Sequence, residues 1–85
     1  MTAANPLEFS VEHLGLAALD TVALKNWYVR VLDAVEVFQN AEIPPAFLLR
    51  LANGPLVEIY PAHTSAPETA NNRLAGWRHL ALKVP

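Results

Sequence analysis

The chain of 85 residues contains no cysteine, so neither a disulfide nor a thiolate zinc site can stabilise it. Charged residues make up only 16% of it, and its six Lys and Arg residues form no basic patch, which argues against nucleic-acid binding. No apolar run approaches the roughly 20 residues of a membrane-spanning helix. The opening residues also lack the basic start and apolar stretch of a signal peptide. We therefore expect a cytoplasmic protein that binds neither membranes nor nucleic acid.

Apolar side chains are abundant, at 53% of the residues, which argues against a disordered chain. A domain of this size buries only about 60–65% of the surface of its unfolded chain, so its core is thin. More apolar surface remains than a small module hides by itself, and docking onto a second copy or a further module would cover it. We expect a homodimer.

The first half of the sequence predicts a strand followed by a helix. Residues 10–18 alternate, with His13 on one face and Leu14 and Leu16 on the other. Asp20 is a typical helix N-cap. An apolar stripe of helical period then predicts a helix over 21–32, ended by Asp33-Ala34; its members are Leu24, Trp27, Tyr28, Val31 and Leu32.

The second half predicts three further strands, a linker and one extra strand. Residues 35–39 form the first of these strands, and two prolines make 40–45 a loop. Asn53-Gly54 predicts a two-residue hairpin turn between strands 46–52 and 55–60, which sets Leu49 opposite Glu58. Residues 61–77 resemble a linker, and 78–84 alternate as a strand again.

Three side chains on these strands could hold a metal ion. The helix needs the apolar face of the sheet, so His13 and, by the same alternation, His79 point away from it. Glu58 lies between Val57 and Ile59, where a buried carboxylate requires a cation. Two imidazoles and a carboxylate suit Fe, Mn, Ni, Co or Zn. Each residue alone also fits a plainer role, as a solvent-facing glutamate or a strand-edge histidine, but the three together favour a metal site.

The predicted hairpin register also defines an apolar pocket around Glu58. Plain core packing between two modules is the simpler explanation of the same side chains. We read His63 as an exposed linker residue. Trp77 either borders the mouth of the pocket or packs. The expected substrate-binding residues are Phe47, Leu49, Leu51, Leu56, Tyr60 and Trp77.

The segments HLGLAALD…WYVRVLDAVEVF, FLLRLANGPLVEIYPA and GWRHLALKVP resemble the vicinal oxygen chelate superfamily, also called the glyoxalase/bleomycin resistance/dioxygenase family. The resemblance implies an α+β fold: a βαβββ module with a mixed sheet, a helix on one face and a concave site on the other, followed by one extra strand. In this family two such modules form a cup around a divalent metal. His13, Glu58 and His79 match three of the four ligands of glyoxalase-like members.

Residues 1–85 then form one partial glyoxalase-like domain, with the module at 10–60, the linker at 61–77 and the first strand of a second module at 78–85. His-Leu-small-Leu indeed recurs after 66 residues, at His13 and at His79. The fourth ligand and the general base have no candidate, so the catalytic residues are unknown. A fragment, a natural half-length protein and a protein that swaps its last strand all remain open.

Three functions follow from these observations. The first is a divalent-metal-dependent lyase, isomerase or dioxygenase that acts on a small oxygen-chelating substrate. The second is a module that binds a small molecule or a drug such as bleomycin without catalysis. The third is an inactive half-domain with a role in assembly, which the missing fourth ligand supports.

Overall fold

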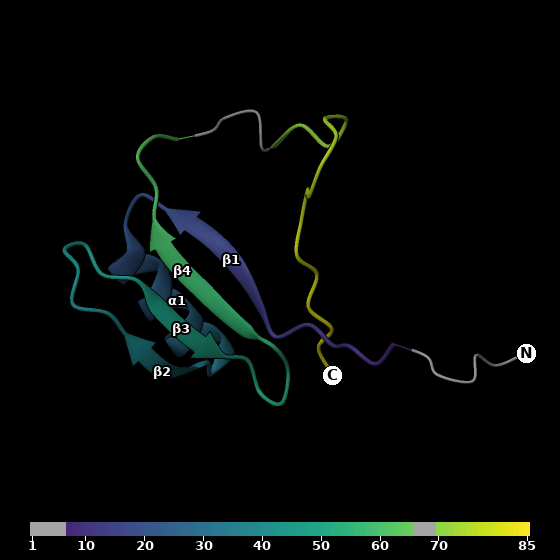
Figure 1. The fold of residues 1–85 in the computed structure, drawn as a ribbon, viewed down its shortest axis with the longest axis horizontal. Coiled ribbons are helices and arrows are strands. Elements are labelled where there is room, and N and C mark those ends of the chain that lie inside the picture. The colour runs from purple at the N-terminus through teal and green to yellow at the C-terminus, as the bar shows by residue number, and fades with distance from the viewer. Residues whose placement is uncertain (1–6, 66–69) are drawn as a thin grey trace, which may run out of the picture.

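The structure is a computed structural model that describes residues 7–65 and 70–85. Within these residues the chain forms a single helix and four strands (Figure 1). This confirms the predicted α+β class and the β-α-β-β-β order. The elements are β1 (His13–Ala18), α1 (Thr21–Leu32), β2 (Val35–Gln39), β3 (Phe47–Arg50) and β4 (Leu56–Pro61).

The strands form one mixed sheet in the order β1-β4-β3-β2. β1 runs parallel to β4, whereas β4 with β3 and β3 with β2 pair antiparallel. Helix α1 packs on one face of this sheet, against β4, β1 and β3, and leaves the other face open. With 12 residues α1 is too short to cross a bilayer, and no other segment of the described ranges forms a helix that could.

Both ends of α1 are set by aspartates, as the sequence predicts. Asp20 Oδ1 accepts a hydrogen bond of 2.9 Å from the backbone N–H of Ala23, which satisfies one free donor of the first turn. At the other end Asp33 adopts the left-handed conformation, with φ of 54°. The N–H of Ala34 can then donate to the carbonyl of Tyr28 at 3.2 Å and close the last turn. The predicted bounds of the helix are confirmed.

The core lies between α1 and the sheet. The interior side chains of the central strands are fully covered there, and Lys25 closes the side near β2. Its Nζ lies 5.1 Å from the ring centroid of Phe47 and 3.3 Å from Glu36 Oε1. The buried apolar residues are Tyr28, Ala34, Phe47, Leu49, Val57 and Ile59.

The predicted hairpin register is wrong by one residue. Leu49 lies opposite Val57, and Leu48 lies opposite Glu58. The reason is Pro55, which has no N–H and so cannot close a two-residue turn against Ala52. Instead the strands end at the Arg50–Leu56 pair and five residues form the loop, which is held by a bond of 2.6 Å from Gly54 N to Leu51 O.

The predicted strand over 78–84 is also absent. Residues 77–85 have no ladder partner and no regular structure, although their side chains alternate as in a strand. Alternation alone does not make a strand, because the backbone donors and acceptors need a neighbouring strand. Of the predicted linker, residues 66–69 lie outside the described residues.

The corrected register predicts losses of stability of different size for two neighbouring leucines. Leu49 is fully buried under α1, so Leu49→Ala should lower the free energy of unfolding by about 2–5 kcal/mol. Leu48→Ala, on the partly exposed open face, should cost clearly less. Urea unfolding followed by circular dichroism measures both, and the reverse order would support the two-residue turn.

The burial of Tyr28 predicts that the stability of the fold depends on pH in the alkaline range. Its side chain is only 8% exposed, and burial raises its pKa above the ordinary value of 10.0. The folded state therefore holds the phenol proton more tightly than the unfolded state does. This stabilisation is fully present below pH 10.0 and is lost as the pH rises through the folded pKa. The free energy of unfolding, measured between pH 9 and 12, should fall less steeply with pH in Tyr28→Phe than in the wild type. The reason is that the variant lacks the phenol proton, roughly one proton, whose binding differs between the folded and unfolded states.

Candidate functional site

The open face of the sheet is a three-row surface formed by alternate residues of the four strands. The ladder fixes which side chains are neighbours, because directly paired residues point to the same face. Each row runs across the sheet, and the three rows are Val35-Arg50-Leu56-His13, then Phe38-Leu48-Glu58-Gly15, then Tyr60-Ala17. The only carboxylate in these rows is that of Glu58, in the second row.

His13 and Glu58 are diagonal neighbours on this face. Gly15 lies opposite Glu58, and His13 is two residues from Gly15 along β1. The spacing of strands and residues in a sheet places the Cα atoms of His13 and Glu58 roughly 8 Å apart. Two of the three predicted ligands are therefore presented to the same space above the sheet.

The imidazole of His13 has one nitrogen engaged and one available. Nδ1 lies 2.9 Å from Glu12 Oε1, and since a carboxylate only accepts, the ring N–H donates at this position. Nε2 is then the unprotonated nitrogen of the neutral ring, which is the form that binds a metal. A second carboxylate behind the histidine is a common arrangement at metal sites. The His13 side chain is 46% exposed, so solutes can reach it.

Glu58 is half-buried among apolar neighbours. It lies beside Leu48 of β3 and Gly15 of β1, and Leu56 is on its own face two residues earlier. Within residues 7–65 and 70–85 its carboxylate makes no hydrogen bond or ion pair. A carboxylate in such surroundings gains most from an added cation or donor.

Tyr60 leans back over Gly15 into the same space. A Cβ atom placed on Gly15 would lie 3.2 Å from Tyr60 Cε1 and 3.9 Å from its hydroxyl oxygen. The same point is 4.0 Å from Glu58 Oε1. The missing side chain at Gly15 thus gives room for the phenol group of Tyr60, which brings a second oxygen-bearing side chain to the face that holds Glu58.

His79 does not join the other two predicted ligands. It lies in the unpaired segment after residue 77 and is exposed. No group of three or more histidine or acidic side chains comes together in the described part of the chain. Of the predicted set of three, only His13 and Glu58 therefore come together on the sheet of a single chain.

The predicted pocket residues divide between two faces. Leu56 and Tyr60 share the face of Glu58, as expected. Phe47 and Leu49 lie in the core under α1, and Leu51 packs against that core, so their expected place beside Glu58 is wrong. The cause is the register set by Pro55. The remaining residue expected in the pocket, Trp77, is 92% exposed and lies outside the sheet.

Sequence reasoning missed that Leu48 and Arg50 of β3 lie on the open face. Leu48 takes the place next to Glu58 that was expected for Leu49, and Arg50 contributes a cation one row away. The signal that could have found them is the proline at 55, since it excludes the two-residue turn. An arginine at this position would favour a substrate with an anionic group.

Comparison of the chain with known proteins finds no relative. No protein-family model, no curated protein and no solved structure matches this chain.

Gly15 gives a test of this arrangement. Gly15→Val should displace the Tyr60 ring, because a Cβ there already approaches the ring to 3.2 Å. The aromatic NMR signals of Tyr60 should shift, whereas those of Tyr28, buried on the opposite face, should stay in place. Tyr60→Phe assigns the signals. Unchanged Tyr60 signals in Gly15→Val would contradict the placement of the ring.

Proposed function

We propose that this chain is a divalent-metal-dependent enzyme of the glyoxalase/dioxygenase type, a lyase, isomerase or dioxygenase, acting on a small oxygen-chelating substrate. The observation that carries the proposal is the placement of His13 and Glu58 on one open face, across Gly15. The β-α-β-β-β order with a mixed sheet is compatible with the glyoxalase type of module.

The donor set fits a divalent metal such as Fe, Mn, Ni, Co or Zn. A neutral imidazole and a carboxylate are ligands that these ions accept. Arg50 of β3 lies diagonally across from Glu58 on the same face, but the two side chains form no ion pair in the described structure. His13 Nε2 and Glu58 would hold the ion, which supplies Lewis-acid stabilisation of a developing oxyanion when bound.

The other residues of the face have separate roles. Leu48 and Leu56 exclude water around the carboxylate and so strengthen its electrostatic interactions. The Tyr60 hydroxyl is placed to donate a hydrogen bond to a substrate oxygen near Gly15. Arg50 attracts an anionic group to the neighbouring row.

A second candidate function is binding without catalysis. The open face is largely apolar, with Leu48, Leu56 and Tyr60 around one carboxylate, and this suits a hydrophobic small molecule or a drug. An inactive half-domain is the third alternative, and the incomplete set of predicted ligands supports it.

Metal binding separates these functions. Protein purified without a histidine tag should bind one divalent ion per site, measured by calorimetry with Mn²⁺, Co²⁺ or Zn²⁺. His13→Ala and Glu58→Gln should each weaken binding roughly tenfold or more. His63→Ala is the matched control, because this histidine is exposed and lies beyond the sheet.

Two results would contradict the enzyme proposal. One is wild-type protein that binds none of these ions, and the other is equal weakening by His63→Ala and His13→Ala. In the first case, binding of an apolar fluorescent dye that Leu56→Asp abolishes would favour the binding module.

A further inference from the structure

Positive charge is concentrated in residues 70–85. They contain three of the six Lys and Arg residues of the chain, namely Arg73, Arg78 and Lys83, and none of its eight Asp and Glu residues. With neutral histidines the formal charge is therefore +3 over 70–85 and −5 over the residues before them. A segment of this sign attracts anions. Three cations are fewer than a nucleic-acid surface needs, so a small anion is the better match.

A hollow lies within this segment, and we call it the Arg78 hollow. Its volume is about 430 Å³, and it is lined by Gly76, Trp77, Arg78 and His79. Volumes of roughly 300–1,000 Å³ are usual for sites that bind small molecules. Figure 1 draws this part of the chain in yellow tones, to one side of the sheet and without a strand. The hollow is thus separate from the open face that holds His13 and Glu58.

The guanidinium group of Arg78 is held in place by the turn that precedes it. The carbonyl of Asn71 accepts from Arg78 Nη1 and from the backbone N–H of Leu74, both at 3.2 Å. Asn71 Oδ1 accepts from the N–H of Arg73 at 3.0 Å, which stabilises the same turn. Gly76 has φ of 111°, and a Cβ placed there would lie 3.7 Å from Arg78 Nη2. The group is therefore positioned before any ligand binds.

The other edge of this guanidinium group, formed by Nε and Nη2, lacks an acceptor. Nε is buried, and within residues 7–65 and 70–85 neither atom makes a hydrogen bond or an ion pair. A buried donor on a charged group is costly when it is left unpaired. Two parallel N–H groups of this kind match the two oxygens of a carboxylate. Because Arg78 lines the hollow, an oxyanion in the hollow would supply the missing acceptor.

Trp77 adds a large aromatic surface to the same hollow. Its side chain is 92% exposed and does not belong to the core cluster. An indole ring offers a flat apolar face, on which another aromatic ring packs well. A ligand that joins an aromatic ring to a carboxylate would therefore use both Trp77 and Arg78.

We propose that the Arg78 hollow is a binding site for a small aromatic carboxylate. The carboxylate pairs with the Nε and Nη2 edge of Arg78, and the ring of the ligand stacks on Trp77. One guanidinium group balances the single charge of a carboxylate, whereas a phosphate monoester carries a charge of about −1.5 to −2 and needs more donors. The site is independent of the metal proposed for the open face.

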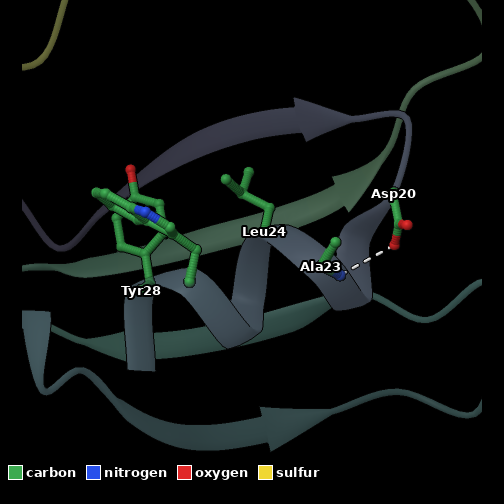
Figure 2. Close-up of a pocket in the computed structure, with 5 residues that line it drawn as sticks. Asp20, Ala23, Leu24 and Tyr28 are labelled. Atoms are coloured by element: carbon green, nitrogen blue, oxygen red, sulfur yellow. Dashed lines mark hydrogen bonds between the residues drawn. The ribbon is translucent and has the colours of Figure 1, made fainter. Parts of the chain in front are cut away.

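A hollow on the flank of α1 provides a natural contrast, because it has aromatic walls but no cation. It is lined by Asp20, Ala23, Leu24, Trp27 and Tyr28. Figure 2 shows Leu24 and Tyr28 projecting from α1 toward the sheet, and Asp20 bound to the first turn. The Asp20 carboxylate repels an anion. This hollow can take up an apolar ring but cannot select a carboxylate, so Trp27 serves as an internal control.

An NMR titration of the full chain with 2-naphthoate tests the site. The Nε–H signal of Arg78 and the indole N–H signal of Trp77 should shift together and saturate, whereas the indole signal of Trp27 should not follow them. The amide 2-naphthamide keeps the ring without the charge, and acetate keeps the charge without the ring. Each should bind roughly tenfold or more weakly than 2-naphthoate, because each lacks one of the two contacts.

Three variants separate the contacts, and all lie outside the folded sheet. Arg78→Lys keeps the charge but removes the paired N–H groups, so it should weaken binding of 2-naphthoate roughly tenfold or more. Arg73→Gln is the matched control, because it removes a cation of the same segment that does not line the hollow. It should change the affinity by less than about twofold. Trp77→Ala should weaken binding of 2-naphthoate and leave that of acetate unchanged.

Several results would overturn the site. An Arg78 Nε–H signal that does not respond to 2-naphthoate, or equal binding of 2-naphthamide, would show that no carboxylate is recognised. Equal weakening by Arg73→Gln and Arg78→Lys would assign the binding to the net charge of residues 70–85. Unchanged affinity for 2-naphthoate in Trp77→Ala would overturn the stacking of the ring, and a Trp27 signal that shifts with the same affinity would place the ligand on α1.

Discussion

One helix on one face of the sheet is the constraint from which the candidate site follows. Val57 and Ile59 are fully buried under α1, and a strand alternates. Glu58 between them must therefore point to the open face. Because paired residues point to the same face, strand pairing also places Gly15 and His13 of β1 and Leu48 of β3 on the open face. The position of the carboxylate is thus set by the packing of its two apolar neighbours.

Local sequence signals predicted the elements well, because the determinants of those elements are local. The bounds of α1 depend on Asp20, on the apolar stripe and on the left-handed Asp33, all of which lie within the helix or beside it. The faces of β1 and β4 also followed from alternation against one helix. These two strands carry His13 and Glu58, so that part of the candidate site could be predicted without the structure.

The pairing of β3 with β4 could not be predicted from its strongest signal. Asn53-Gly54 favours a two-residue turn, but that turn needs an N–H at position 55, and proline has none. The resulting shift of one residue moves every side chain of β3 to the opposite face. Phe47 and Leu49 are consequently core residues, while Leu48 and Arg50 join the site. For 78–84 the missing information is of another kind, since alternation describes a strand but cannot supply its partner.

The open face of the sheet and the free edge of β1 are both left uncovered by the rest of this small chain. A thin core hides the helix side of the sheet only, and Leu48, Leu56 and Tyr60 remain partly in water. Covering apolar area contributes about 25 cal/mol per Å². A ligand or partner that binds only the folded state also shifts the folding equilibrium toward that state. A metal held by Glu58 and a substrate above Leu56 would both act on the open face. Binding of either one therefore stabilises the sheet on which the other depends.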